Sequence, residues 1–284
     1  MLRYLLTGAT GMLGQDLQQA LVGREVTALG RADLDVTDPD AVDAAVAGHA
    51  VILNSAAYTR VDDAEGDEDA AFAVNATGAG NLARAAARHG AKLVQLSTDY
   101  VFDGTATTPY PEDSPRHPVS AYGRTKAEGE RLALELNPEG TYVVRTAWLY
   151  GAHGPNFPKT MLRLAAQNDT VSVVDDQLGQ PTWTADVARQ IVAMLDAELA
   201  PGVYHATSSG STSWFEFARA VFSVAGLDPD RVKPTSSAQF VRPAPRPAYS
   251  VLGHVRWQLL GLAPIRDWRS ALADAAQNGV LERT

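Results

Sequence analysis

The sequence predicts an α/β fold, a doubly wound parallel sheet of the Rossmann type with a smaller C-terminal substrate-binding domain. Two observations lead to this prediction. Short apolar runs alternate with longer helical patterns in the first half of the chain, and a glycine-rich turn follows the first run. Because the alternation becomes irregular after about residue 150, we expect a dinucleotide-binding domain over 1–150, to which later segments return, and mainly a substrate-binding domain over 151–284. The cleft between them would hold the site.

Apolar runs and their flanking residues set the order of the elements. The predicted strands cover residues 3–6, 25–29, 51–54, 92–97 and 142–145. The predicted helices cover 11–21, a segment starting at Thr37, 70–88, 122–136, 158–167, 185–197, a segment starting at Ser213, and 267–277. Thr37 and Ser213 are typical of helix starts. The segment 242–247 contains three prolines, which exclude a helix or a central strand, so it must be an extended loop.

The composition excludes several classes of protein. The 284 residues include no cysteine, which rules out disulfides and thiolate chemistry and fits a reducing compartment, so we expect a cytoplasmic protein. A net charge of −9 disfavours binding to nucleic acid or to anionic membranes. No apolar run approaches the roughly 20 residues that span a bilayer. The apolar run at the start of the chain is too short for that of a signal peptide. The six histidines lack paired ligand spacing, so we expect no metal site.

A glycine-rich turn lies between the first predicted strand and the first predicted helix. Its G-x-x-G-x-x-G pattern and the residues within it predict cofactor contacts from Gly8, Thr10, Gly11, Met12, Leu13 and Gly14. Glycines in this context permit a tight turn and let a pyrophosphate approach the backbone. The helix N-terminus adds free N–H groups and a favourable dipole. Chance spacing is the alternative, and the position directly after the opening strand favours dinucleotide binding.

The end of the second predicted strand bears on the choice of cofactor. An acidic residue there would hold the ribose hydroxyls of NAD. This chain has Leu29, Gly30 and Arg31 instead, and Arg31 could pair with the 2′-phosphate of NADP. Asp35 and Val36 follow and are expected to touch the adenine. We therefore predict NADPH, with NADH as the other candidate; a solvated surface arginine is the alternative interpretation of Arg31.

A tyrosine and a lysine lie one helical turn apart in the next long helix. Tyr122 and Lys126 are spaced i, i+4 and share a helix face. A nearby ammonium would lower the pKa of the tyrosine, which could then pass a proton to a developing alkoxide. Thr98 ends the fourth strand, where its hydroxyl could hydrogen-bond a substrate carbonyl oxygen. The alternatives are a surface helix pair and ordinary strand-end turn chemistry.

Together these motifs resemble the extended short-chain dehydrogenases/reductases and, more narrowly, the dTDP-4-dehydrorhamnose reductase family. The most specific segment is 97–102, Ser-Thr-Asp-Tyr-Val-Phe. Further similar segments occur in the family's order at 54–59, 61–65, 145–151, 156–157, 161–162, 176–177, 181–182 and 246–247. They spread over nearly the whole chain, whereas the glycine pattern alone is shared with many unrelated activities.

The resemblance implies specific roles. The catalytic residues would be Thr98, Tyr122 and Lys126, with threonine in place of the superfamily's usual serine. Besides the glycine-turn residues, Asp35 and Val36, the cofactor contacts would include Ala56, Ala57, Tyr58, Tyr122 and Lys126. Substrate contacts would come from Val61, Thr98, Asp99, Tyr100 and Trp148, and from Asn156 and Arg246 at the nucleotide end. The guanidinium of Arg246 also suits a diphosphate on chemical grounds, the alternative being an ordinary loop arginine.

The implied activity is NADPH-dependent reduction of the 4-keto group of dTDP-4-dehydro-L-rhamnose to dTDP-L-rhamnose. Two alternatives stay open: another nucleotide-sugar reductase or epimerase, and a non-catalytic regulatory subunit of the same fold. The partner would be a small-molecule nucleotide sugar, and the chain would be a monomer or a homodimer. Some members of the family are magnesium-bridged dimers held by glutamates, but this chain has Gln15 after the third glycine, so we expect no metal.

Overall fold

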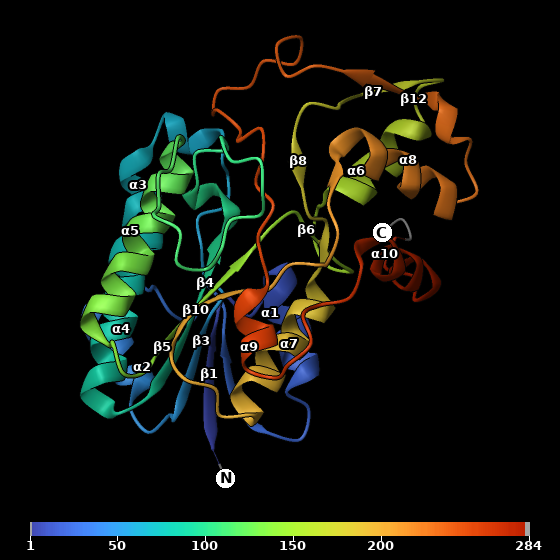
Figure 1. Ribbon diagram of the computed structural model, residues 1–284. Coiled ribbons are helices and arrows are strands. Elements are labelled where there is room, and N and C mark those ends of the chain that lie inside the picture. Colours follow the sequence, from blue (N-terminus) through green and yellow to red (C-terminus); the bar gives the residue numbers. More distant parts are fainter. Residues whose placement is uncertain (1, 282–284) are drawn as a thin grey trace.

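The computed structural model describes residues 2–281, and a six-stranded parallel sheet forms its centre (Figure 1). Its strands are β1 (Arg3–Thr7), β2 (Glu25–Leu29), β3 (Val51–Asn54), β4 (Lys92–Thr98), β5 (Thr141–Thr146) and β10 (Gly202–His205). They lie in the order β10-β5-β4-β3-β1-β2, and every neighbouring pair is parallel. The order runs outward from β1 in both directions, so the predicted doubly wound sheet is confirmed.

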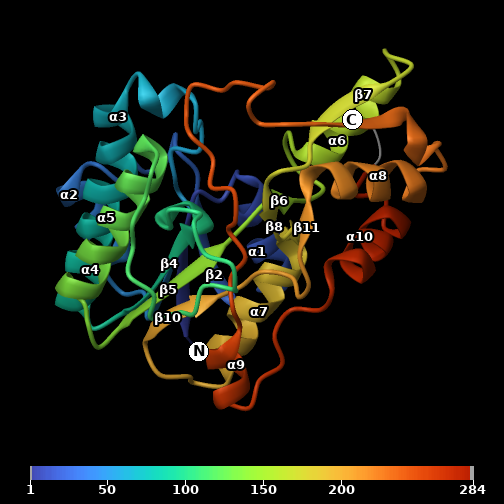
Figure 2. The same cartoon turned by 45° about the horizontal axis from the view of Figure 1, so that its top comes forward.

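Helices cover both faces of the sheet (Figure 2). One face carries α1 (Met12–Ala20), α7 (Thr184–Asp196) and α9 (Val255–Leu259); the other carries α2 (Pro39–Val46), α4 (Gly78–His89) and α5 (Ala121–Leu136). Successive residues of a strand point to opposite faces. Thus Leu6 packs in the core with Leu17 and Ile191, whereas its neighbour Leu5 packs in the core with Val42 and Leu82. Burial on both faces explains the apolar runs of the central strands β1 and β3.

Segments beyond residue 150 return to the sheet. The strand β10 pairs with β5, and α7 and α9 share the core with α1. The two predicted domains therefore interleave along the chain, and the boundary at residue 150 stays a prediction. No helix among residues 2–281 is both long enough and apolar enough to cross a bilayer.

A second core forms around three helices and three short strand pairs. The helices are α6 (Phe157–Ala165), α8 (Trp214–Val224) and α10 (Trp268–Gln277). The pairs are β7 (Val171–Val174) with β12 (Val232–Thr235), β8 (Leu178–Gly179) with β11 (Thr212–Ser213), and β6 (Leu149–Tyr150) with β9 (Thr182–Trp183). Residues 236–248 then run without helix or strand from β12 back to the N-terminal half, along the top of Figure 1, as the prolines predict.

The alanine-rich stretch expected as one helix over 70–88 is divided. It consists of α3 (Glu68–Phe72), a π-helical turn η2 (Ala73–Thr77) and α4. The turn contains Asn75, whose carbonyl oxygen lies so near α5 that a Cβ on Gly129 would be 2.1 Å from it. Local π-turns of this kind often occur at functional sites. Three single 3₁₀ turns are η1 (Asp63–Glu65), η3 (Asp99–Val101) and η4 (Pro229–Arg231).

Candidate active site

The glycine-rich turn joins β1 to α1 where the strand order reverses, between β1 and β3. Gly8 has a φ of 67°, in the left-handed region, and a Cβ there would lie 2.6 Å from the backbone of Ser55 and Ala56. A Cβ on Gly14 would lie 2.2 Å from the Gly8 carbonyl oxygen. Helix α1 can therefore approach β1 this closely only with glycine at position 14.

The start of α1 offers hydrogen-bond donors to an anion. Gly11 precedes the helix without a side-chain cap, and the first intrahelical bond runs from the Gln15 N–H to the Gly11 carbonyl oxygen at 3.0 Å. The N–H groups of Met12, Leu13 and Gly14 therefore have no partner within the helix. Together with the positive end of the helix dipole, these groups fit a pyrophosphate.

The turn after β2 brings in a carboxylate that the sequence analysis missed. Asp33 folds back so that its carboxylate accepts the Gly30 N–H at 2.8 Å, and its own N–H donates to the Gly30 carbonyl oxygen at 3.1 Å. Thr10 adjoins the same turn, since a Cβ on Gly30 would lie 2.9 Å from the Thr10 methyl carbon. An aspartate three residues after a glycine is typical of such a side-chain-capped turn, and this spacing could have pointed to Asp33 in the sequence.

Arg31, Asp35 and Val36 lie on the segment that follows β2. Hydrogen bonds from the N–H and hydroxyl of Thr37, together with the charge of Arg31, lower the pKa of Asp35, so its carboxylate is ionised. Arg31 is exposed. Val36 is buried, and its carbonyl oxygen accepts a hydrogen bond from the Asn81 amide at 3.1 Å.

The loop after β3 is held by a buried amide. The Asn75 side chain accepts the Tyr58 N–H at 2.9 Å and donates to the Tyr58 carbonyl oxygen at 3.1 Å. The same amide donates to the Thr125 hydroxyl on α5 at 3.1 Å. The predicted cofactor residues Ala56, Ala57 and Tyr58 are therefore fixed between the glycine turn and α5.

Thr98, Tyr122 and Lys126 meet at the carboxyl edge of the sheet. Thr98 is the last residue of β4, whereas Tyr122 and Lys126 lie in the first two turns of α5. The Thr98 hydroxyl lies beside the Tyr122 phenol. The Lys126 Nζ donates to the Leu96 carbonyl oxygen on the same strand at 2.6 Å. The structure therefore brings together the three predicted catalytic residues.

The pKa values of the tyrosine and the lysine shift in opposite directions. Burial, followed by the Asp99 carboxylate, raises the pKa of Tyr122, and the Thr98 hydroxyl only partly opposes this. The expectation that the lysine lowers the pKa of the tyrosine is wrong here, because Nζ is turned to the Leu96 carbonyl oxygen. Burial lowers the pKa of Lys126 to about 8, although Glu130 opposes it. A phenol that keeps its proton at neutral pH is suited to act as a general acid.

Asp99 is a buried carboxylic acid beside the phenol. It is 1% exposed, and its Oδ1 accepts the Thr98 hydroxyl at 3.0 Å. Its buried Oδ2 has no hydrogen-bond partner among the residues described. Burial raises the pKa of Asp99 to about 6, although the hydroxyls of Ser250 and Thr98 lower it. Ionised Asp99 is therefore a destabilising charge in the folded state.

Replacing this acid by an isosteric amide is expected to stabilise the protein at neutral pH. Folding raises the pKa of Asp99 from 3.8 to about 6. The protonated acid therefore contributes to the free energy of unfolding below pH 3.8, and this contribution, about 3 kcal/mol, is lost as the pH rises from 3.8 through 6. Asp99→Asn removes this loss but leaves the new side-chain NH2 group without a hydrogen-bond partner, so we expect a net gain of about 1–2 kcal/mol at pH 8. Urea unfolding between pH 4 and pH 8 measures it.

The control for this prediction is Asp230→Asn, which removes the same charge from a side chain that is 79% exposed. The difference in unfolding free energy between Asp99→Asn and the parent should grow between pH 4 and pH 6. A difference that stays flat over this range would show that Asp99 does not titrate there.

A buried ion cluster holds α5 against β4 and β5. The Arg145 guanidinium donates to both carboxylate oxygens of Glu130, at 2.9 and 2.8 Å, and the two side chains are 3% and 0% exposed. Ser97 and Arg116 also donate to this carboxylate. Ser97 and Arg145 are register partners across β4 and β5. The cluster therefore sets the position of the helix that carries Tyr122 relative to the strand that carries Thr98.

Trp148 has an unusual backbone conformation at the same edge. Its φ is 47°, in the left-handed region, which costs about 1–3 kcal/mol for a side chain of this size. It follows Thr146, the register partner of Thr98, by two residues. Its ring is confined by Gly179, since a Cβ there would lie 2.4 Å from the indole. The structure therefore places this predicted sugar contact just beyond the end of β5, the strand that pairs with the one carrying Thr98.

The two residues predicted at the nucleotide end both have hydrogen-bonding partners within the chain. Asn156 caps α6, accepting the Lys159 N–H at 3.1 Å and donating to the Gly151 carbonyl oxygen at 2.8 Å. Both ends of its amide thus already have partners within the chain. The side chain of Arg246, on the 236–248 segment, is 16% exposed. Its guanidinium pairs with Asp62, directly after Val61, at 2.9 Å and donates to the Ala244 carbonyl oxygen at 2.7 Å.

The 236–248 segment closes onto the N-terminal half through Asp62. Arg242 and Arg246 both pair with this carboxylate, and the Ala244 N–H donates to it at 3.3 Å. The Arg246 guanidinium also lies 6.0 Å from the ring centre of Tyr100. The Tyr100 ring in turn meets that of Tyr122 edge-on, at 5.6 Å. An aromatic contact chain thus links this segment to the candidate proton donor.

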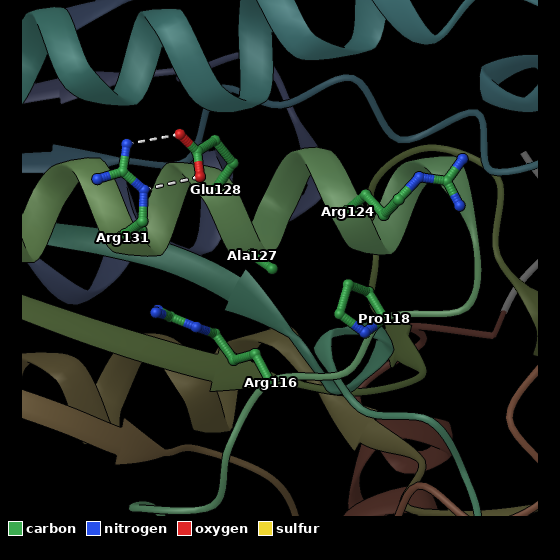
Figure 3. Close-up of a pocket in the computed structure, with 6 residues that line it drawn as sticks. All are labelled: Arg116, Pro118, Arg124, Ala127, Glu128 and Arg131. Atoms are coloured by element: carbon green, nitrogen blue, oxygen red, sulfur yellow. Dashed lines mark hydrogen bonds and ion pairs between the residues drawn. The ribbon is translucent and has the colours of Figure 1, made fainter.

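A separate pocket of about 240 Å³ lies between α5 and the segment that carries Arg116 and Pro118 (Figure 3). Its lining residues are Arg116, Pro118, Arg124, Ala127, Glu128 and Arg131. Those on α5 repeat at helical spacing on the face opposite Tyr122 and Lys126, and Glu128 is paired with Arg131. The pocket is therefore distinct from the catalytic edge. Residues 2–281 contain no group of three or more histidines and acids arranged to hold a metal.

Comparisons with known proteins identify the family of this chain. Residues 2–280 match the family model described as the RmlD substrate binding domain. A dTDP-4-dehydrorhamnose reductase of Streptomyces griseus is 53% identical, with 96% of this chain and 92% of that protein covered. A dTDP-4-keto-6-deoxy-D-glucose reductase of Streptomyces niveus is 50% identical, with 96% of each chain covered.

A solved structure gives the same result in three dimensions. The dTDP-4-dehydrorhamnose reductase of Bacillus anthracis, in complex with NADP, is 39% identical, with a TM-score of 0.94 over 98% of this chain and 100% of that one. The match covers both the six-stranded sheet and the C-terminal core. The chain therefore belongs to the dTDP-4-dehydrorhamnose reductase family.

Proposed function

We propose that this chain reduces the 4-keto group of dTDP-4-dehydro-L-rhamnose with NADPH, giving dTDP-L-rhamnose. The observation that carries the proposal is the meeting of Thr98, Tyr122 and Lys126 at the sheet edge where the glycine turn also lies. Family membership supplies the substrate class, since the similar proteins are named for reduction of dTDP-linked keto sugars.

The chain's own residues supply the proton and orient the carbonyl. The phenol of Tyr122, protonated at neutral pH, donates its proton to the substrate's keto oxygen as the carbon is reduced. The Thr98 hydroxyl turns from Asp99 to the same oxygen and orients it. Lys126 keeps one N–H on the Leu96 carbonyl oxygen, which leaves two N–H groups for a cofactor ribose. NADPH supplies the hydride when bound.

The remaining contacts follow the geometry described. We assign the pyrophosphate to the donors at the start of α1, and the adenosine to the segment of Arg31, Asp35 and Val36. The sugar would lie among Val61, Asp99, Tyr100 and Trp148, with Arg246 toward the diphosphate. Asp62 then competes with the diphosphate for Arg246, so binding would open that ion pair.

Arg31 is expected to set the cofactor preference. Its exposed guanidinium can pair with the 2′-phosphate of NADPH, a group that NADH lacks. Arg31→Ala should therefore raise the KM for NADPH about tenfold and leave the KM for NADH unchanged. Steady-state kinetics with each cofactor measures this, with Arg88→Ala as the exposed-arginine control. Equal or better turnover of NADH by the parent protein would contradict the prediction, and Asp33 would then be the first residue to test.

The proposed function is tested by NADPH oxidation with purified dTDP-4-dehydro-L-rhamnose, followed by absorbance. Rapid oxidation with formation of dTDP-L-rhamnose supports it. Turnover only with another dTDP-keto sugar would reassign the substrate within the family. NADPH binding without oxidation of any such sugar would favour the regulatory-subunit alternative.

We further propose that the chain works as a monomer or homodimer in the cytoplasm. The absence of cysteine fits a reducing compartment. Light scattering of the purified protein and fractionation of producing cells test the two statements separately.

A further inference from the structure

The orientation of Trp148 depends on a second tryptophan. The indoles of Trp148 and Trp214 are stacked, with centroids 3.6 Å apart and planes 8° from parallel. Phe157 packs against Trp214 with its ring centre 4.5 Å away. All three side chains are only partly buried, so the stack lies at the surface of the second core and not inside it.

Backbone pairing ties Trp214 to the other side of Trp148. In the antiparallel pair of β8 and β11, Gly179 lies opposite Thr212, and Ser213 then caps α8, which begins at Trp214. A side chain at Gly179 would collide with the Trp148 indole. One strand pair therefore supplies both Gly179 and the start of the helix that carries Trp214. The Trp148 indole lies against both.

The left-handed backbone of Trp148 needs this support. A bulky residue keeps such a φ only where its surroundings hold it, and such residues are concentrated at functional sites. We propose that Trp214 is a positioning residue that holds the Trp148 indole as a fixed wall of the sugar-binding part of the site. The inference rests on the proposed function, in which Trp148 borders the sugar beside Thr98.

Three variants test the inference: Trp214→Leu removes the stack, Trp214→Phe keeps an aromatic ring, and Phe215→Leu is the matched control. Phe215 is the next residue of α8 and lies under the Arg219 guanidinium. Circular dichroism reports the exciton coupling of the stacked indoles without any ligand. Calorimetry with dTDP-L-rhamnose and with NADPH gives the two affinities, and steady-state kinetics gives KM and kcat.

We expect Trp214→Leu to lose the exciton signal and to weaken dTDP-L-rhamnose binding about tenfold, with a similar rise in the KM of the keto sugar. Its NADPH affinity should stay within about twofold of the parent value, because the glycine turn is untouched. Trp214→Phe should restore most of the sugar-nucleotide affinity. Phe215→Leu should behave as the parent protein does.

Two results would overturn the inference. One is unchanged dTDP-L-rhamnose affinity in Trp214→Leu after the exciton signal is lost. The other is an equal loss of NADPH and sugar-nucleotide affinity, shared with Phe215→Leu, which would indicate a general structural effect. A parent protein that binds dTDP-L-rhamnose but does not reduce the keto sugar overturns only the proposed function, since the binding ratios still decide the role of Trp214. A parent protein that binds no sugar nucleotide overturns both.

Discussion

Tyr122→Phe should lower kcat by about two to four orders of magnitude, the range found when a positioned general acid is removed. The variant keeps the aromatic ring that meets Tyr100 edge-on at 5.6 Å and loses only the hydroxyl. The glycine turn and its donors are unaffected, so the Kd for NADPH should stay within about threefold of the parent value. Stopped-flow turnover and fluorescence titration of NADPH measure the two quantities.

Tyr142→Phe is the matched control for that variant. Tyr142 is a second tyrosine with little solvent exposure, and its hydroxyl donates to the Leu199 carbonyl oxygen at 2.8 Å. It lies near the amino end of β5, away from the carboxyl edge that carries Thr98 and Tyr122. Its removal should affect stability and leave kcat unchanged. Full turnover by Tyr122→Phe would discard the assignment of the phenol as proton donor.

Arg145→Met should lower the free energy of unfolding at pH 7 by about 3–5 kcal/mol, because it leaves the carboxylate of Glu130 buried without its principal partner. Burial alone raises the pKa of Glu130, and Arg145 overcomes this and holds the pKa below its ordinary value. Without Arg145 the pKa of Glu130 should rise in the folded state. The loss of stability should therefore shrink as the pH falls and Glu130 takes up a proton. Urea unfolding from pH 5 to pH 8 measures both effects.

An exposed ion pair of the same geometry provides the control. Arg124 donates to Glu68 at 2.9 and 2.7 Å, much as Arg145 does to Glu130. The side chains of Arg124 and Glu68 are, however, 45% and 41% exposed. Arg124→Met should therefore cost less than about 1 kcal/mol. Similar losses in the two variants would show that the buried cluster is not what fixes α5 on the sheet.

Local sequence patterns predicted five of the six sheet strands and the residues that we propose as catalytic. Apolar runs indicated these strands, and the central ones, such as β3, are buried on both faces, whereas the edge strand β2 is not. Three local features predicted the candidate site: the glycine pattern, the spacing of Tyr122 and Lys126, and the hydroxyl of Thr98. Each could be recognised because it depends only on residues close by in the sequence. β10 was not predicted, because its sequence Gly-Val-Tyr-His contains no continuous apolar run and follows irregular sequence.

Sequence spacing was a poor guide to the electrostatics of the site. The i, i+4 arrangement predicted that Lys126 would lower the pKa of Tyr122. In the fold, the Leu96 carbonyl oxygen takes the lysine's N–H, and Asp99 places a carboxylate beside the phenol. A pKa depends on burial and on charges brought in by other strands, which the helix alone cannot supply.

Patterns local to the chain predicted five of the six sheet strands, the glycine turn at the first crossover and the three residues that we propose as catalytic. The distant residues that support them could be identified from the fold alone. Glu130 meets Arg145 because β4 and β5 pair in one register, and Trp214 meets Trp148 because β11 pairs with β8. Periodicity and turn chemistry act between residues close in sequence. Such long-range contacts depend instead on strand register and on the path of the chain, which no local pattern specifies.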